Sequence, residues 1–410
     1  MKSVANPSTT ATPSRLLYAT SAGLGGAGLN TTSLEGVLAS WRGGYLSRAI
    51  CYANRQQEVP AGKVRSLQHH PVRLLSCLGS KDYYAAKKTY LDWHVARELR
   101  RGGYDFFHGW SGECFQSLVE ARMRGVPSVM DVPTWHRNKG VVKPAETKTE
   151  REARLKDRGW RDWRKHLHAT RLHNLAEYDL ASILLMPSRK SAETFLVAGI
   201  PERKLQYVGR GVDLARYRPA EAPPEVFRVG FVGALIQRKG VHHLIEAWKR
   251  LRLHDAELVL VGSVHEEIKP FLHGAEEAGV RVVGFTSSVQ DELRRCAVFA
   301  FPSECEGFAK STLEAAACGL PLIATRESGD AIVDQETGLL IPPNNVDALC
   351  AALEHAAKHR DALAEMGRKA RAWWSVSSRG ITTGSASRQD TPERSQWDAE
   401  AQAAIALKGF

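Results

Sequence analysis

No stretch of the 410-residue sequence is apolar over the roughly 18 to 20 residues that a membrane-spanning helix requires. Residues 1–14 are rich in Ser, Thr and Pro and lack the apolar core of about 7 to 15 residues that a secretory signal carries. We therefore expect a flexible N-terminus over residues 1–14 and a protein that is not integral to a membrane. The expected location is the cytoplasm, with peripheral contact at the inner membrane face left open.

The sequence also lacks paired cysteines. Its seven cysteines are scattered and odd in number, and no two of them form a C-x-x-C pair. This pattern argues against a disulfide framework and against a zinc site. We expect reduced thiols that are mostly buried.

Acidic residues are fewer than basic ones, because 45 Asp and Glu stand against 56 Lys and Arg and leave a net charge of +11. This balance favours anionic partners, but charge alone does not separate nucleotide sugars, acidic lipid head groups and nucleic acid. Hydrophobic residues make up 43% of the chain and charged residues 25%, as in soluble globular proteins. The length predicts two or three domains, and we expect two large ones.

Short apolar runs that suggest strands alternate with helical patterns in two parts of the chain. In the first part the expected strands are 15–20, 48–52, 104–107 and 126–130, and the expected helices are 32–41, 83–99 and 114–123. After a Pro-rich break at 217–224, further strands are expected at 227–232, 258–261, 281–283, 298–301 and 322–324. Such alternation implies parallel sheets. We therefore predict an α/β protein with two doubly wound, Rossmann-like domains over residues 15–220 and 221–374.

Two segments fall outside this scheme. Residues 137–171 carry twelve Lys and Arg against five Asp and Glu. They form either an exposed helical insertion or a basic amphipathic surface for an anionic acceptor or membrane. Residues 375–410 form a polar tail rich in Ser, Thr, Gly and Arg up to residue 394, which we expect to be flexible, with a short helix over 395–407.

A glycine-rich stretch follows the first expected strand. Gly23-x-Gly25-x-x-Gly28 matches the dinucleotide-binding fingerprint, in which glycines let a phosphate or sugar approach amides at a helix start. The fingerprint also needs an acidic residue at the end of the second strand, where this chain has residues 51–55 without one. The stretch therefore argues against a nicotinamide cofactor, and a tight turn without a ligand is the alternative.

Two cations follow the first strand of the second domain. This strand runs into Gly233, and Arg238 and Lys239 come shortly after it. Open α/β sheets bind ligands beyond the carboxyl ends of their strands. A guanidinium and an ammonium there suit a diphosphate, and a solvated pair at a helix start is the alternative.

A pair of carboxylates follows the expected strand 298–301. Glu306 lies in a turn with Gly307, and Glu314 lies about two helical turns further on. Each carboxylate can accept two sugar hydroxyls, so both can serve one elongated ligand. The alternative is structural, with Glu306 capping the helix and Glu314 in a buried ion pair.

Several short motifs occur in a fixed order through the second half of the chain. They are Pro187-Ser188, Gly209-Arg210-Gly211-Val212-Asp213, Arg238-Lys239-Gly240, Pro302-Ser303-x-x-Glu306-Gly307-Phe308, Glu314, Cys318-Gly319-Leu320-Pro321 and Thr337-Gly338-Leu339-Leu340. Together they resemble the retaining glycosyltransferases of family 4. The resemblance is close over about residues 177–372, and over residues 15–136 it is limited to the general layout.

The resemblance implies a GT-B fold, in which an acceptor-side and a donor-side domain face each other across a cleft. It assigns Glu314 to the nucleotide ribose, Glu306 to hydroxyls of the transferred sugar, and Arg238 with Lys239 to the diphosphate. The resemblance places further residues at the donor: Gly233, Gly307, the backbone amides of Phe308, Ala309, Lys310, Ser311 and Thr312, and the Gly25-Gly26 loop of the other domain.

The implied reaction moves a hexose from a nucleoside-diphosphate sugar to a hydroxyl of a glycan, a lipid-linked or a small-molecule acceptor, with retention at the anomeric carbon. Fixed cations and N–H dipoles would stabilise the departing diphosphate. We expect neither a metal nor a cofactor, because Arg and Lys carry the charge and no Asp-x-Asp motif is present. A UDP-sugar is favoured over a GDP-sugar as donor, and no nucleic acid partner is expected.

Two positions depart from the family pattern. Ala234 stands where the family usually has Arg, and Arg210 is a candidate to compensate. Pro133 falls where the family has a histidine that contacts the donor sugar, so His136, three residues later, becomes the catalytic candidate, with a surface histidine as the alternative.

Two other functions stay open. A sugar-nucleotide epimerase of similar fold would need further acidic and histidine groups for proton abstraction, and the Glu306 to Glu314 block points away from it. A catalytically inactive nucleotide-sugar-binding protein is favoured by Ala234, by Pro133 and by the polar tail.

Overall fold

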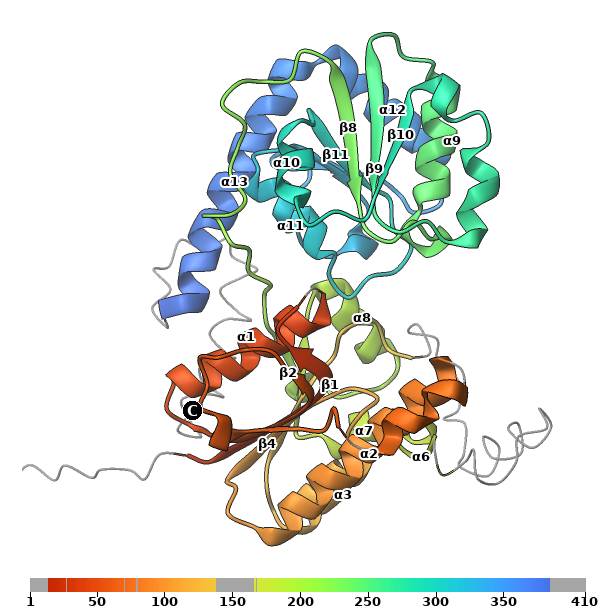
Figure 1. Cartoon of the computed structure of the whole chain (residues 1–410). Coiled ribbons are helices and arrows are strands. Elements are labelled where there is room, and N and C mark those ends of the chain that lie inside the picture. The colour runs from red at the N-terminus through yellow and green to blue at the C-terminus, as the bar shows by residue number, and fades with distance from the viewer. Residues whose placement is uncertain are drawn as a thin grey trace, which may run out of the picture. The chain divides into compact units, whose positions relative to one another are not determined.

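The computed structural model describes residues 14–26, 28–69, 71–78, 80–137, 166 and 168–383. The chain divides into two compact units, each with a sheet flanked by helices (Figure 1). The first unit comprises residues 1–133, 141–185 and 197–205, and the second comprises 134–140, 186–196 and 206–410. No described helix is long and apolar enough to span a membrane.

The first sheet has seven strands in the order β3-β2-β1-β4-β5-β6-β7. These strands are β1 (Leu16–Leu24), β2 (Leu46–Asn54), β3 (Val64–Ser66), β4 (Phe106–Trp110), β5 (Ser128–Asp131), β6 (Ile183–Met186) and β7 (Leu205–Tyr207). The ladders from β3 through β6 are parallel. The first six residues of the central strand β1 are buried without a break, as expected for a parallel strand covered on both faces.

The second sheet has six parallel strands in the order β10-β9-β8-β11-β12-β13. They are β8 (Phe227–Val232), β9 (Ala256–Val261), β10 (Val280–Gly284), β11 (Val298–Phe301), β12 (Leu322–Ala324) and β13 (Gly338–Leu340). Strands β8, β11 and β12 match the predicted ranges residue for residue. Every residue of β11 and β12 is buried.

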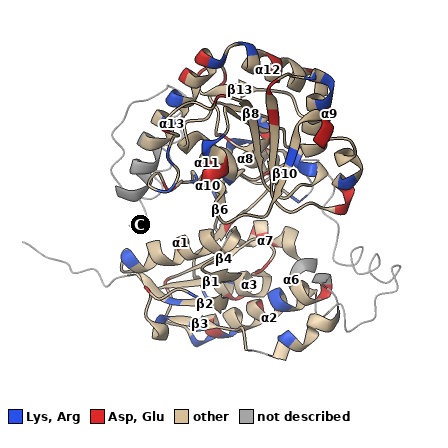
Figure 2. Cartoon of the chain, turned by 45° about the horizontal axis from the view of Figure 1, so that its top comes forward, with Lys and Arg blue, Asp and Glu red and all other residues tan. Residues whose placement is uncertain are grey.

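Eleven α-helices lie in the described part of the chain. They are α1 (Leu29–Arg42), α2 (Ser80–Arg101), α3 (Phe115–Met123), α6 (Ala169–Leu172), α7 (Asn174–Leu180), α8 (Arg189–Val197), α9 (Val241–Leu251), α10 (Val289–Arg294), α11 (Lys310–Ala317), α12 (Val346–Lys358) and α13 (Arg360–Thr383). Figure 2 shows charges of both signs along α9 and α12, and Arg250 of α9 pairs with Asp347 of α12 at 3.2 Å. These surface charges therefore partly neutralise one another.

Helix α13 corrects one expectation. The polar tail was expected to be flexible from residue 375, but α13 continues to Thr383. Trp374 anchors α13 just before this segment, because its ring is buried and its Nε1 donates to the carbonyl of Ala331. The rest of the tail, with the expected helix 395–407, lies outside the described residues. The same holds for residues 138–165 and 167 of the predicted basic insertion.

Both sheets reverse their strand order beside their first strand. In the first sheet β1 lies between β2 and β4, and in the second sheet β8 lies between β9 and β11. The loops that leave two such neighbouring strands diverge to opposite faces of the sheet, and the crevice between them is where open α/β sheets bind ligands. In the second unit the loop after β8 carries Arg238 and Lys239, and the loop after β11 carries Glu306. Glu314 lies in α11, which follows that second loop.

Candidate functional site

The loops after β8 and β11 approach each other at a glycine. The chain passes from β8 through Gly233 and a 3-10 turn over Gln237–Lys239 to Gly240, which precedes α9. Gly240 has a φ of +68°, and a Cβ there would lie only 1.9 Å from the carbonyl oxygen of Pro302. Only glycine fits this conformation and this approach. Gly240 therefore fixes Arg238 and Lys239 beside the loop that follows β11.

The structure brings together Arg238, Lys239 and Glu306, as the sequence predicted for a shared site. Arg238 Nη1 lies 2.9 Å from Glu306 Oε1, and Lys239 Nζ lies 3.6 Å from the same oxygen. Arg238 also donates to the carbonyl of Cys305. The Glu306 side chain is 15% exposed and that of Arg238 is 46% exposed. The guanidinium thus keeps N–H donors on the solvent side while the carboxylate is covered.

Lys239 is held from two further directions. Its Nζ lies 5.2 Å from the centre of the Phe301 ring at the end of β11. A Cβ added at Gly233, which has a φ of +154°, would lie 3.0 Å from the same nitrogen. The absence of a side chain at Gly233 therefore leaves room for the ammonium at the carboxyl end of β8.

The start of α11 supplies fewer free amides than the sequence suggested. The amide of Ala309 donates to the carbonyl of Ser328 at 2.8 Å, and the amide and hydroxyl of Thr312 both bond to the carbonyl of Ala309. Among the described residues, the amides of Lys310 and Ser311 have no backbone acceptor outside the helix. Of the five predicted cradle amides, those of Ala309 and Thr312 are therefore engaged, and those of Phe308, Lys310 and Ser311 have no backbone acceptor among the described residues.

Phe308 and Gly307 lead into that helix. Gly307 is buried, and Phe308 is partly buried, with its ring edge-on to Trp374 at 6.3 Å between centres. This contact joins the Glu306 turn to α13. The position of the turn thus depends on packing as well as on the ion pairs.

Glu314 is a partly buried carboxylate of α11. Burial raises the pKa of its carboxyl above the ordinary value, and the nearby Tyr217 hydroxyl partly opposes this shift. Burial likewise raises the pKa of Tyr217. Glu314 thus costs free energy to keep ionised, and it lies only eight residues after Glu306. These features fit a ligand-binding group better than a surface charge.

The glycine loop of the first unit begins later than predicted. Strand β1 continues to Leu24, so Gly23 lies within the strand, and its amide donates to Asn30 Oδ1 at 2.8 Å. Gly25 and Gly26 follow with φ angles of +99° and +125°. Their backbone conformation favours glycine, at the point where the first sheet reverses its strand order. Their assignment to a donor stays a prediction.

Buried carboxylates hold the neighbouring loop after β4. Glu177 accepts hydrogen bonds from the amides of Gly112 and Cys114, and burial raises its pKa to about 8. Glu113, between these two residues, accepts a hydrogen bond from the amide of Ser21 at 2.7 Å. The loop after β4 is thereby fastened to β1 at the strand-order reversal.

His136 packs against α8. Its side chain is buried, its amide donates to Thr194 Oγ1 at 2.9 Å, and its ring is edge-on to Phe195 of α8. The structure thus places His136 in packing around α8 rather than on the surface. Its catalytic role stays a prediction.

His108 and Asp131 form a pair that the sequence reading missed. His108 Nε2 lies 2.9 Å from Asp131 Oδ2, and both side chains are mostly covered. His108 belongs to β4 and Asp131 ends β5, which is the neighbouring strand. The signal was available, because polar residues near the carboxyl ends of two successive buried runs meet when their strands pair.

Comparison with known proteins agrees with this architecture. Residues 226–359 match the family model described as Glycosyl transferases group 1. The chain is 28% identical over 271 residues to the MMP alpha-(1→4)-mannosyltransferase of Mycolicibacterium hassiacum, and 29% identical over 283 residues to a GDP-mannose-dependent alpha-mannosyltransferase of Mycobacterium tuberculosis. These alignments cover 62% and 63% of this chain, and 62% and 66% of the two relatives. The chain thus spans less than two thirds of either relative.

The fold is shared with solved structures. Anabaena HepE in complex with UDP superposes with a TM-score of 0.60 and 18% sequence identity, over 88% of this chain and 94% of HepE. At this identity the likeness concerns the fold alone. The chain therefore has the two-domain α/β architecture called GT-B, and its residues 226–359 are similar to the proteins described as Glycosyl transferases group 1.

Proposed function

We propose that this protein is a retaining glycosyltransferase of family 4, which moves a hexose from a nucleoside-diphosphate sugar to a hydroxyl acceptor without a metal at the diphosphate. The observation that carries the proposal is the contact of Glu306 with both Arg238 and Lys239. This group lies where the second sheet reverses its strand order, which is the usual ligand position in such sheets. The similarity of residues 226–359 to a family of glycosyl transferases supports the same reaction.

The cations suit the leaving group. Breaking the bond between the anomeric carbon and the diphosphate leaves an electron pair, and hence negative charge, on the diphosphate oxygen. Arg238 can bind two phosphate oxygens with its exposed N–H groups, and Lys239 adds a point charge. The N–H groups of Lys310 and Ser311, at the start of α11, add the positive ends of their peptide dipoles. Groups fixed in advance stabilise this charge most effectively as it develops.

The carboxylates suit the hydroxyl groups of the donor. Glu306 would accept hydroxyls of the transferred sugar and Glu314 those of the ribose. The nearby Tyr217 hydroxyl favours the ionised form of Glu314, whose oxygens have lone pairs for a ligand. Ribose hydroxyls would add hydrogen bonds that favour the same ionised form.

The nucleotide base of the donor and the acceptor are proposed on separate grounds. We retain a UDP-sugar as the expected donor, and HepE binds UDP, whereas three mannosyltransferase relatives are named as GDP-mannose-dependent. The acceptor is proposed to be a glycan, a lipid-linked or a small-molecule hydroxyl. Contact of the basic segment 137–171 with an anionic membrane surface, for a protein that works in the cytoplasm, is proposed from its composition alone.

A ligand screen followed by a turnover assay tests the proposal. A nucleotide or nucleotide sugar at about 100 times its dissociation constant should stabilise the folded chain by roughly 2.7 kcal/mol, seen as a raised melting temperature. The donor that binds best is then incubated with the protein, and the released sugar is analysed by NMR. Slow hydrolysis that Glu306→Ala abolishes supports a transferase, and a newly formed α-sugar from an α-donor supports retention.

Other outcomes decide against the proposal. No stabilisation by any nucleotide removes its basis. Binding without turnover, with a panel of acceptors present, identifies an inactive nucleotide-sugar-binding protein. Release of the free 2-epimer identifies a sugar-nucleotide epimerase.

A further inference from the structure

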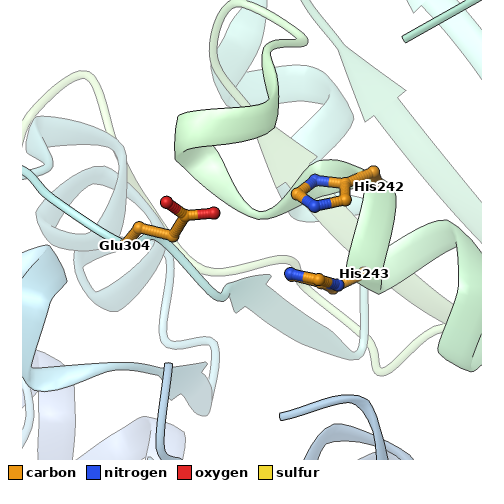
Figure 3. A group of neighbouring side chains, drawn as sticks. All are labelled: His242, His243 and Glu304. Atoms are coloured by element: carbon orange, nitrogen blue, oxygen red, sulfur yellow. The ribbon is translucent and has the colours of Figure 1, made fainter. Parts of the chain in front are cut away.

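Two histidines and a glutamate of the second unit face one another outside the Glu306 group. His242 and His243 lie in the first turn of α9, and Glu304 lies in the loop after β11. Figure 3 shows the Glu304 carboxylate pointing toward the two imidazole rings. One ring nitrogen of each histidine and one carboxylate oxygen all lie within 4.8 Å of one another, and the three side chains are partly buried.

Polar atoms of this group lack partners. The Nδ1 atoms of His242 and His243 are buried and have no hydrogen-bond partner in the described part of the chain. Among the described residues, Glu304 forms no ion pair that would use up its carboxylate. A buried polar atom left without a partner costs on the order of 1 to 3 kcal/mol. Two such nitrogens beside a carboxylate that has no ion pair therefore indicate a ligand that can bond to all three side chains.

We propose that His242, His243 and Glu304 bind a divalent transition-metal ion, with Zn²⁺ as the best match. Imidazole nitrogens and carboxylate oxygens are its usual ligands together with thiolates, and three protein ligands with an open fourth position form a common zinc arrangement. Tetrahedral ligands about 2.0 to 2.2 Å from the ion lie roughly 3.3 to 3.6 Å apart. The three ligand atoms lie within 4.8 Å of one another, so binding would draw them together by at most about 1.5 Å.

Asn344, in a third segment of the chain, contacts the ring of His243. Its Oδ1 lies 3.2 Å from Nε2 of His243. Metal-binding histidines generally use their second nitrogen for a hydrogen bond of this kind, which orients the ring. If Nε2 instead faces the ion, the same oxygen is placed as a fourth ligand.

The site lies directly beside the cation loop. The amide of Glu304 donates to the carbonyl of Arg238 at 2.9 Å, and the hydroxyl of Ser303 bonds to the same carbonyl. A metal ion would therefore join the start of α9 to the loop after β11, the two segments that carry Arg238 and Glu306. This inference does not rest on the proposed transfer reaction, and it adds a metal site where the sequence predicted none.

Direct metal binding tests the inference. The full chain is produced without a histidine tag, freed of metal with a chelator, and titrated with Zn²⁺ by calorimetry. We expect one ion per chain, and we expect Glu304→Gln and His242→Gln each to weaken binding by more than about 10-fold. The matched controls are Glu277→Gln and His254→Gln, which change exposed residues of the same unit and should leave the affinity unchanged.

A second measurement covers variants that fold poorly. Co²⁺ bound to the wild-type chain should show the intense visible absorption of a low-coordinate nitrogen and oxygen site, and Zn²⁺ should displace it. Absence of one-to-one Zn²⁺ binding overturns the inference. Equal affinity in the wild type and in folded Glu304→Gln, or a weak six-coordinate Co²⁺ spectrum, also overturns it.

Discussion

Glu306 and Arg238 form an ion pair, with 2.9 Å between Oε1 and Nη1, although 68 positions separate them in the chain. The same carboxylate holds Lys239, so a diphosphate would compete with Glu306 for both cations. Glu306→Gln removes the competing charge and keeps the size of the side chain. We expect nucleoside-diphosphate affinity to hold or rise, while donor turnover falls about 10- to 100-fold through loss of a charged hydrogen bond worth roughly 1.5 to 3 kcal/mol.

Calorimetry with the nucleotide and a turnover assay with the nucleotide sugar separate these two effects. A parallel loss of affinity and turnover would mean that Glu306 holds the site together rather than contacting the sugar. Glu327→Gln serves as the matched control. The backbone carbonyl of Glu327 accepts a hydrogen bond from the Glu306 amide, and this contact does not involve the Glu327 side chain.

Arg238→Lys should separate bidentate binding from charge. A lysine keeps the positive charge but cannot bind two phosphate oxygens in the planar geometry of a guanidinium. We expect nucleoside-diphosphate affinity to fall about 10-fold, with little change for the nucleoside, because a charge-assisted contact is worth about 1.4 kcal/mol or more. Arg368→Lys, on the exposed face of α13, should bind as the wild type does. Equal losses for nucleoside and diphosphate would place Arg238 away from the phosphates.

Gly240→Ala tests the close approach of the loops after β8 and β11. The new Cβ would lie 1.9 Å from the carbonyl oxygen of Pro302, in a backbone conformation with φ of +68°. Gly274 has a similar φ of +62° and nothing within 4 Å of an added Cβ. We expect Gly274→Ala to cost about 1 to 2 kcal/mol from the backbone alone, and Gly240→Ala to cost clearly more, about 3 kcal/mol or above. Urea unfolding measures both, and equal losses would contradict the close approach.

Glu314 should make nucleotide binding depend on pH. Burial raises the pKa of its carboxyl, so it takes up a proton at a higher pH than a free glutamate, whose pKa is about 4.3. Ribose hydroxyls donate to the ionised form, so affinity should fall as the pH is lowered through this raised pKa. Binding should also release a proton in that range, because the ligand favours the ionised carboxylate.

The matched variant for this effect is Glu314→Gln. Titration of the nucleotide phosphate is common to both proteins and cancels when their affinities are compared. Calorimetry in buffers with different ionisation enthalpies counts the released protons. An affinity difference between wild type and Glu314→Gln that stays constant with pH would show that Glu314 does not ionise in contact with the ligand.

The sequence was most informative where a local pattern determines structure. Strands β11 and β12 were predicted to the residue because they are short, continuous apolar runs bounded by turns, and in β8 only Arg228 and Gly230 interrupt the apolar residues. Strand β3 was not predicted, because Val64–Ser66 is a three-residue edge strand with no buried side chain and hence no apolar run. A strand of that kind depends on its neighbour rather than on its own sequence.

The sequence predicted which residue types form the candidate site, but it did not predict the contacts between them. The sequence selected Arg238, Lys239 and Glu306, but their ion pairs depend on the adjacency of β8 and β11. The hydrogen bond of the Ala309 amide to Ser328 likewise arises from a distant segment. The His242, His243 and Glu304 group was missed for the same reason, since no spacing within one segment reveals it.

The order of strands in the first sheet has a consequence for how the chain is made. Strand β1 is synthesised before the other strands of its sheet, yet it is a central strand, and Leu16 pairs with Phe106 of β4. At about 5 to 20 residues per second, the nascent chain waits on the order of ten seconds before β4 exists. During that interval β1 presents two apolar faces and an unpaired edge. We therefore expect early truncations before residue 106 to aggregate or to recruit chaperones, whereas longer nascent chains cover this strand.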